Sequence, residues 1–296
     1  MDLRHLRYFV AVAEELHFRR AAERLYVAQS ALSIQIKTLE DHLGGKLLTR
    51  NNRRVELTDA GRLFLEQARR ILAQVDDSTQ LVRRALVGEV GLLRLSYSGS
   101  AAASGILAKV TRAFRQYSLD VEICAQEMHP ISQMEALLSG EIHASLMPTL
   151  AVDVPQDLKV TRLGVWPLRL ALPDNHPLLL KRHIRVSDIE REPFIVCAAS
   201  AGDDGTAIFR RTLGFSPVIA HHVPVVMMVT ALVGAGLGLG VLPECMAIAA
   251  KQAGAVLRPI SNVNISTDIS LVTLAVCREP VTQRLLAITE DAFGQC

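Results

Sequence analysis

Hydrophobic residues recur at helical spacing near the start of the chain and predict two short amphipathic helices. The apolar side of the first comprises Leu6, Phe9, Val10 and Ala13, and the second helix spans about Phe18–Leu25. The residues around Tyr26–Ala28 are expected to form a turn that leads into the next helix.

A third helix is predicted from about Gln29 to His42. It has one narrow apolar stripe, formed by Leu32, Ile36, Leu39 and Leu43, and it ends at the pair Gly44-Gly45. The opposite face presents Ser30, Ser33, Ile34, Lys37 and Thr38, with Gln29 and Gln35 on its flanks. We therefore expect this second face to point away from the core of its own domain.

A hairpin with a charged tip is predicted after the third helix. The basic stretch Arg50-Asn51-Asn52-Arg53-Arg54 leads into the alternating run Val55–Leu57, which is typical of a strand. Thr58 then has a side chain suited to the N-cap of a further helix.

One long helical pattern without proline runs from Asp59 to about Val87. Its seam alternates in steps of four and three residues through Phe64, Ala68, Ile71, Val75, Ser78, Val82 and Ala85. Such a seam, with Ser78 as its polar member, predicts a helix that pairs with another helix. The alternative is a helix that packs only on its own domain.

Strands and helices alternate after Gly88 and Gly91. The predicted strands are Leu92–Tyr97, Val121–Ala125, Ile142–Met147, Leu168–Leu172 and Phe194–Cys197. The predicted helices pass through Leu107, Val110 and Phe114, and lie at Ile131–Leu138, Thr206–Leu213 and Val226–Val233. This alternation predicts parallel sheets with helices on both faces.

Composition and charge narrow the classes of protein that fit. The chain has 296 residues and a formal net charge of +2, with its basic excess in Met1–Thr58. That excess permits nucleic-acid binding. The first apolar stretch, Tyr8–Ala13, stops at Glu14-Glu15 and is too short for a secretory or membrane segment. We therefore expect a cytoplasmic protein that has no membrane contact.

The cysteines do not form a metal-binding or disulfide pattern. Cys124, Cys197, Cys245, Cys277 and Cys296 are scattered, without a CxxC pair or a Cys/His cluster of zinc-ligand spacing. We expect small core residues or an exposed C-terminal thiol, and neither a metal nor another cofactor.

Several motifs resemble the LysR-type family of transcriptional regulators. They are Leu3-Arg4-His5-Leu6-Arg7-Tyr8-Phe9, Ala21-Ala22-Glu23-Arg24-Leu25, Ala28-Gln29-Ser30-Ala31-Leu32-Ser33, Ile36-Lys37-Thr38-Leu39-Glu40 and Leu57-Thr58-Asp59-Ala60-Gly61. Weaker similarities follow in the family's order: Leu137-Leu138-Ser139-Gly140-Glu141-Ile142, Asn175-His176-Pro177-Leu178 and Gly234-Ala235-Gly236-Leu237-Gly238 through Leu242-Pro243. The resemblance spans nearly the whole chain.

The resemblance implies an α+β multidomain fold. The expected parts are a winged helix-turn-helix at residues 1–58, a linker helix for dimerisation at 59–89 and an effector-binding domain at 90–296. The last is expected to be a two-lobed α/β sensor of the periplasmic-binding-protein type. Lobe I would comprise 90–161 and 269–296, and lobe II 162–268, with crossovers near Thr161–Gly164 and Val263–Asp268. The family also implies a homo-oligomer, a dimer or a homotetramer, and RNA polymerase as a partner.

The third helix is expected to enter the major groove of double-stranded promoter DNA, because that is the role of the second helix in a helix-turn-helix motif. The predicted reading set is Gln29, Ser30, Ser33, Ile34 and Lys37. Arg50, Arg53 and Arg54 on the wing are expected to contact phosphates or the minor groove. The alternative is that Ser33 and Thr38 are merely solvated, that Ile34 packs on a neighbouring helix and that the arginines form a solvated charge run.

A small-molecule effector is expected between the lobes, where ligands of such folds bind. The predicted contacts are Ser98, Ser100, Met128, His129 and Pro130, with the Ala198–Gly205 loop also lining the cleft. Free N–H groups at the helix after Ser98 and Ser100 suggest a carboxylate among the candidate effectors. The uncharged stretch Met147-Pro148-Thr149 suggests instead an effector more apolar than a dicarboxylate. The alternative is that the serines are loop and cap residues.

Other functions would require other sequence features. An enzyme on a doubly wound fold would need a catalytic motif, and the chain has no GxSxG, no HExxH and no phosphate-binding glycine loop after a strand. A solute-binding protein would need an export signal and no DNA-binding head. A thiol-sensing regulator of the same family remains the alternative within the class, with Cys197 at the start of a cleft loop.

Overall fold

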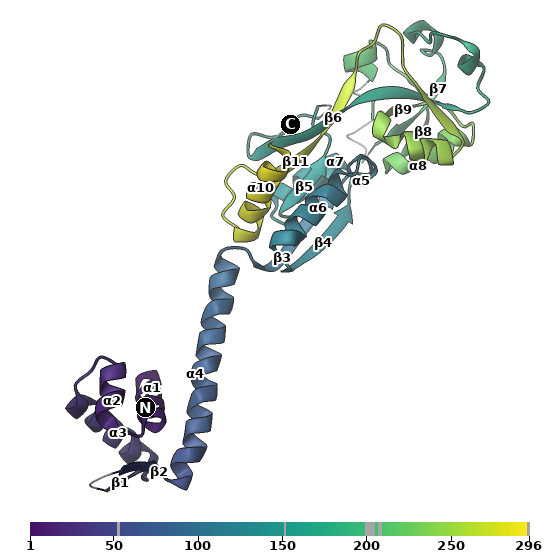
Figure 1. Cartoon of the computed structure of the whole chain (residues 1–296). Coiled ribbons are helices and arrows are strands. Elements are labelled where there is room, and N and C mark those ends of the chain that lie inside the picture. Colours follow the sequence, from purple (N-terminus) through teal and green to yellow (C-terminus); the bar gives the residue numbers. More distant parts are fainter. Residues whose placement is uncertain (52–53, 151, 199–204, 207–208, 295–296) are drawn as a thin grey trace. The chain divides into compact units, whose positions relative to one another are not determined.

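The computed structural model describes residues 1–51, 54–150, 152–198, 205–206 and 209–294 (Figure 1). It divides into two compact units, Met1–Arg84 and Ala85–Cys296. Each unit has buried hydrophobic clusters of its own.

Three helices form the core of the first unit: α1 (Leu3–Glu15), α2 (Phe18–Arg24) and α3 (Gln29–Leu43). Asp2 caps α1 by accepting hydrogen bonds from the backbone N–H groups of Arg4 and His5. Buried side chains from all three helices meet, among them Phe9, Ala21 and Ile36. Leu43 is 41% exposed, so the predicted buried stripe of α3 ends one turn earlier than expected.

The wing is an antiparallel hairpin of β1 (Leu48–Asn51) and β2 (Arg54–Leu57), and its tip at 52–53 lies outside the described residues. Thr58 follows β2 and accepts a hydrogen bond from Gly61 N–H at 2.9 Å. A Cβ at Gly61 would lie 2.0 Å from the Leu47 carbonyl oxygen. Glycine is therefore required where the next helix passes the wing.

Helix α4 (Asp59–Leu86) has two different environments along its length. Phe64, Leu65 and Leu72 pack against the core of the first unit beside the buried Ala68, and the Phe9 and Phe64 rings lie 5.1 Å apart. Further along, Ile71 and Val82 are 42% and 59% exposed. Phe64 and Ala68, the first two positions of the predicted seam, thus pack in the core of the helix's own domain. Ile71 and Val82, which follow on the seam, do not.

The sheet of the second unit is mixed, which corrects the prediction of wholly parallel sheets. Strand β3 (Val90–Tyr97) pairs in parallel with β4 (Asp120–Glu127) and β5 (Ala144–Met147). The return strand β11 (Ser266–Leu274) runs antiparallel to β5 and to the long strand β6 (Leu158–Pro173). We call this part the first lobe.

Strand β6 continues from the first lobe into a second one. Up to Pro167 it pairs with β11, and from Leu168 it pairs with β9 (Gly240–Pro243) and β10 (Ala255–Arg258). The change of partner comes later than the crossover expected near Thr161–Gly164, because the two long strands stay hydrogen-bonded up to that point. A parallel pair, β7 (Pro193–Cys197) and β8 (Val218–Val223), completes the second lobe.

Helices cover the strands of both lobes. In the first lobe they are α5 (Gly99–Ala103), α6 (Ile106–Tyr117), α7 (Pro130–Leu138) and α10 (Pro280–Phe293). In the second they are α8 (Val226–Gly234) and α9 (Ala247–Gln252), with the short 3-10 helices η1 (Pro177–Leu180), η2 (Val186–Asp188) and η4 (Glu244–Met246) and the π-helix η3 (Phe209–Leu213). The single helix expected after Ser100 is thus divided into α5 and α6, and the one expected at Thr206–Leu213 is described only as η3.

Candidate functional site

Helix α3 presents the polar face that the sequence predicted. Gln29, Ser30, Ile34 and Lys37 are exposed, and Ser33 is half-buried. The side chain of Ile34 is 62% exposed, so it does not pack on a neighbouring helix as the alternative required. Lys37, Ser33 and Ile34 also line one groove together with Lys46 and Leu48. The first unit therefore offers an open helical surface beside the wing.

A buried carboxylate that the sequence analysis overlooked positions the wing against α3. Glu40 is 3% exposed and accepts hydrogen bonds from the backbone N–H groups of Leu47 and Leu48 at 3.0 and 3.2 Å. Lys46 Nζ donates to its other oxygen at 2.8 Å. The available signal was the position of Glu40 four residues after Ile36 on the buried stripe. These hydrogen bonds hold the start of β1 against helix α3.

The wing arginines are only partly described. Arg54 is an exposed residue of β2, and Arg50 belongs to β1. Arg53 lies outside the described residues. The backbone is therefore described on both sides of the wing tip, at Arg50 and at Arg54.

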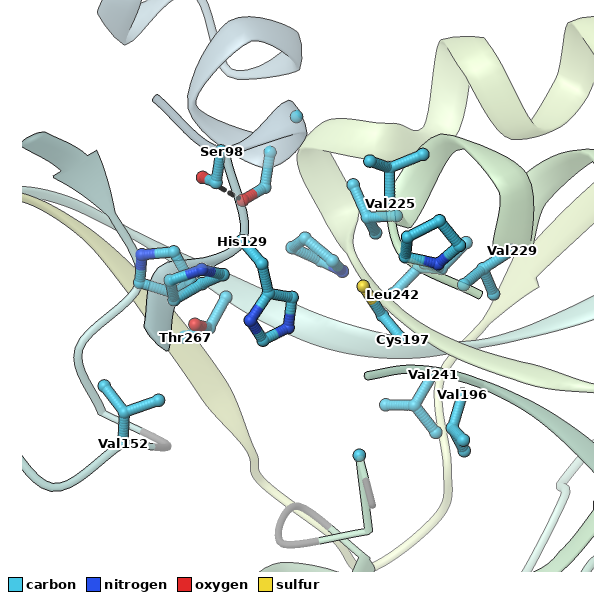
Figure 2. A pocket seen from close by; sticks show the side chains of 18 of the residues that line it. Ser98, His129, Val152, Val196, Cys197, Val225, Val229, Val241, Leu242 and Thr267 are labelled. Carbon is cyan, nitrogen blue, oxygen red and sulfur yellow. Dashed lines mark hydrogen bonds between the residues drawn. The ribbon is translucent and has the colours of Figure 1, made fainter. Parts of the chain in front are cut away.

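A cavity of about 230 Å³ lies between the two lobes of the second unit. All five predicted contact residues line it: Ser98, Ser100, Met128, His129 and Pro130. Figure 2 shows Ser98 and Thr267 to the left of the cavity, Val225 and Val229 to the right, and His129 between them. Two loops that follow parallel neighbours β3 and β4 thus meet at one mouth, as expected for strand C-terminal ends.

The opposite wall was largely missed by the sequence analysis. It comes from the ends of β7, α8 and β9 and is almost wholly apolar: Ile195, Val196, Cys197, Val225, Val226, Val229, Val241, Leu242 and Pro243. Gly205 and Cys197, at the edges of the predicted Ala198–Gly205 loop, line the cavity, whereas 199–204 lie outside the described residues. The only sequence signal for this wall was the run of valines before and within the predicted helix Val226–Val233.

The two cleft serines are buried and bonded to their own loop. Ser98 caps α5 by accepting a hydrogen bond from Ala101 N–H, and the Ser98 and Ser100 hydroxyls lie 3.0 Å apart. Helix α5 has five residues, and the carboxylate of Glu127 lies beside its start at Gly99. The predicted anion-binding helix terminus is therefore a short turn with an acidic neighbour. This end of α5 therefore does not favour the binding of a carboxylate.

A buried polar cluster supports the Met128–Pro130 loop. Gln133 is completely buried, and its Oε1 accepts hydrogen bonds from Ser96 and Ser145 at 3.0 and 2.8 Å. Its Nε2 donates to the Met128 carbonyl at 2.8 Å. Since Ser96 and Ser145 lie on β3 and β5, this network fastens the loop after β4 to the centre of the sheet.

Asp268 fastens another edge of the cavity. It is fully buried in β11 and accepts hydrogen bonds from Thr149 N–H, Leu150 N–H, Thr149 Oγ1 and Ser270 Oγ at 2.5–2.9 Å. Burial by itself raises the pKa of this carboxyl, but the four donors outweigh it and hold the pKa below its ordinary value of 3.8. Neighbouring Pro148 and Thr267 line the cavity.

The thiols near the cavity differ in their surroundings. Cys245 donates a hydrogen bond to the Ser100 carbonyl at 3.8 Å, and burial raises the pKa of its thiol to about 11. It therefore stays protonated at neutral pH and is a poor nucleophile. Cys197 is half-buried at the cavity wall. Within the described residues, no His, Cys, Asp and Glu side chains gather in a way that could hold a metal ion.

No helix among the described residues is both long enough and apolar enough to cross a membrane.

Two family models match the chain. The model described as "Bacterial regulatory helix-turn-helix protein, lysR family" matches residues 3–62, and the model described as "LysR substrate binding domain" matches residues 87–294. Together they account for both compact units.

Individual relatives and solved structures agree with these models. The transcriptional regulator AlsR of Bacillus subtilis is 39% identical over 248 residues, 82% of this chain and 81% of its own. The regulator XapR of Escherichia coli is 32% identical over 287 residues, 97% of this chain and 96% of its own. The structure of full-length CbnR with its target DNA is 28% identical, has a TM-score of 0.77 and covers 99% of each chain. The predicted combination of a helix-turn-helix head with a two-lobed sensor is confirmed.

Replacing Asp268 by Asn should lower the free energy of unfolding of the second unit by about 2–4 kcal/mol at pH 7, because an amide cannot accept all four hydrogen bonds. The folded-state pKa is lowered, so the wild-type advantage is present above the ordinary pKa of 3.8 and is lost as the pH falls below it. Urea unfolding at pH 7, 5 and 3 measures the difference. Asp174→Asn, at an exposed position, is the control and should have little effect. A difference that stays constant over this pH range would contradict the assignment.

Proposed function

We propose a division of labour for this chain, which belongs to the LysR family of bacterial transcription regulators: α3 and the wing bind promoter DNA, α4 pairs two copies, and the cavity between the lobes binds the effector. The observation that carries the proposal is that residues from two separate loops, predicted from sequence as effector contacts, line one cavity with an apolar opposite wall. A concave, mainly apolar site with few polar groups is typical of small-molecule binding.

Promoter binding is assigned to the exposed face of α3. Gln29 and Ser33 have side chains that can hydrogen-bond base edges in the major groove, and Ile34 can contact a thymine methyl group. Ser30 and Lys37 flank them on the same face. The wing arginines, Arg50, Arg53 and Arg54, are assigned to phosphate or minor-groove contacts. The similarity to the DNA complex of CbnR supports this placement.

Self-association is assigned to the part of α4 that leaves the core of the first unit. Val75 is half-buried, and Ile71 and Val82 are exposed on the predicted seam. A helix with an uncovered apolar stripe gains free energy by pairing with a second copy of the same stripe. We propose a homodimer through this segment and a homotetramer as the working assembly.

The effector is assigned to the cavity, where binding would change the relation of the two lobes and thereby the state of the DNA-bound oligomer. We propose that the regulator works at the chromosome in the cytoplasm and contacts RNA polymerase there. The proposal includes no catalytic step. A thiol-based switch at Cys197 is not favoured, because the sequence has no second cysteine within ten residues of it.

Ser33→Ala should reduce affinity for a DNA site selected from a random pool by about 1–3 kcal/mol, with little change for random DNA, because it removes a base-edge contact. Arg54→Ala should weaken both by similar factors and flatten the dependence on salt concentration, because it removes a phosphate contact. Fluorescence anisotropy at several salt concentrations measures both variants. Loss of base preference in Arg54→Ala alone would reverse the two assignments.

Ile71→Glu should shift the oligomer toward smaller species at micromolar concentration, because it places a charge on the pairing stripe. Affinity for a two-half-site DNA should fall with it, since both heads must be held at a fixed spacing. Ala73→Glu adds the same charge to another exposed position off the stripe and should leave both properties unchanged. Light scattering and anisotropy are the measurements. Equal behaviour of the two variants would remove α4 as the pairing element.

Val225→Trp should fill the cavity, because the half-buried Val225 lines it at the start of α8. Val218→Trp is the control, since Val218 is 55% exposed on β8 and does not line the cavity. Small molecules that raise the unfolding temperature of the wild type in a metabolite screen should also stabilise Val218→Trp but not Val225→Trp. Selected-site DNA should bind both variants equally. Ligands that stabilise Val225→Trp normally would place the effector site elsewhere.

A further inference from the structure

The charges around the effector cavity have one sign. Among its described lining residues Glu127 is the one acidic side chain, and none is Lys or Arg. The sequence 198–208, part of which lies outside the described residues, also contains no Lys or Arg. An anionic effector would therefore meet no formal positive charge from an arginine or lysine of this lining.

Glu127 occupies the place where an effector carboxylate was expected. It is the last residue of β4, directly before the Met128–Pro130 loop, and its side chain is exposed at the cavity. A Cβ built on Gly99 would lie 2.9 Å from Glu127 Oε1, so this carboxylate lies beside the first residue of α5. The structure gives the Glu127 side chain no ion-pair partner among the described residues. A second carboxylate at this point would be repelled by the first.

His129 is the lining side chain that could supply a positive charge by protonation. Its Nδ1 accepts a hydrogen bond from Ile131 N–H at 3.4 Å where it caps α7. A ring nitrogen that accepts this hydrogen bond leaves Nε2 as the donor of the ring. The imidazole is therefore a polar contact at the cavity and not a permanent positive charge like that of arginine or lysine.

The remaining surface of the cavity favours an apolar body. Val225, Val229 and Leu242 face the polar loops across the cavity (Figure 2), and Ile195 and Phe209 continue this wall. Such side chains exclude water and make a charge without a partner costly to bind. The polar groups are confined to one side, around Ser98, Glu127 and His129.

We propose that the effector is a small molecule with an apolar body and a hydroxyl or amino group that donates a hydrogen bond to Glu127, and that the cavity discriminates against carboxylates. This inference rests on the proposed assignment of the cavity as the effector site. The donor is directed at the charged side and the apolar body at the valine wall. Glu127 thus sets the class of effector that the regulator detects.

The test uses matched probes on the full-length protein. Benzyl alcohol, benzylamine and benzoate share one apolar body, and isobutanol, isobutylamine and isobutyrate share another. Calorimetric titration should give the alcohol or amine of at least one set about tenfold tighter binding than its carboxylate, the size expected for one charge-assisted hydrogen bond. Tighter binding of the carboxylates, or no difference within either set, would overturn the proposal.

Variants then assign the discrimination to one side chain. Glu127→Gln keeps the shape and should reduce the preference for the donor by about tenfold, and Glu127→Lys should reverse it toward the carboxylate. Glu122→Gln, an exposed β4 position that does not line the cavity, should keep the wild-type preference. An unchanged preference in Glu127→Gln would overturn the inference while leaving the cavity as the effector site. If the probes bind Val225→Trp as well as the wild type, the assignment of the cavity itself fails.

Discussion

The antiparallel ladder between β6 and β11 is the interaction on which the sensor unit depends. It runs from the pair Leu158 and Leu274 to the pair Ser266 and Pro167, so both strands leave the first lobe side by side. Because β6 then pairs with β9 and β10, the two lobes share one continuous strand. A ladder of backbone hydrogen bonds resists shear but can bend where partners change. The change of partners lies next to the cavity, because Leu168 and Thr267 both line it.

Buried polar side chains position three segments beside the candidate sites. Glu40 holds the start of the wing, Gln133 holds the Met128 carbonyl and Asp268 holds the N–H groups of Thr149 and Leu150. In each case a side chain from a helix or strand hydrogen-bonds backbone groups in a loop or at the start of a neighbouring strand. Buried backbone donors and acceptors must be paired, so such residues restrict the loop to one arrangement. They position the loops and the wing beside the two candidate sites.

Helix α4 has two environments because its two stretches have different neighbours. Its first turns complete the hydrophobic core of the head through Phe64 and Ala68, which orients the helix relative to α1. Further along, Ile71 and Val82 of the predicted seam are exposed. One helix therefore has a stretch that completes the core of the head and a stretch whose apolar side chains stay uncovered among the described residues.

The sequence by itself determined the succession of helices and wing in the head, the outward face of α3 and the loops that form the polar side of the cavity. These depend on short-range periodicity and on the rule that neighbouring parallel strands end at the same edge. Ser98, Ser100 and Met128–Pro130 could be placed together for that reason. The extent of the α4 seam and the mixed direction of the sheet were mispredicted, because both depend on which distant segment becomes the neighbour.

Only the tertiary structure decided the apolar wall from α8 and β9, the position of Glu127 beside Gly99 and the partners of Asp268. Thr149 and Asp268 are 119 residues apart in the chain, and no local pattern links them. The local signal at Ser98 and Ser100 suggested an anion site, yet the chain had already placed a carboxylate there. The net charge at a site depends on all side chains that lie near it in space. A local sequence pattern does not show which distant residues become these neighbours.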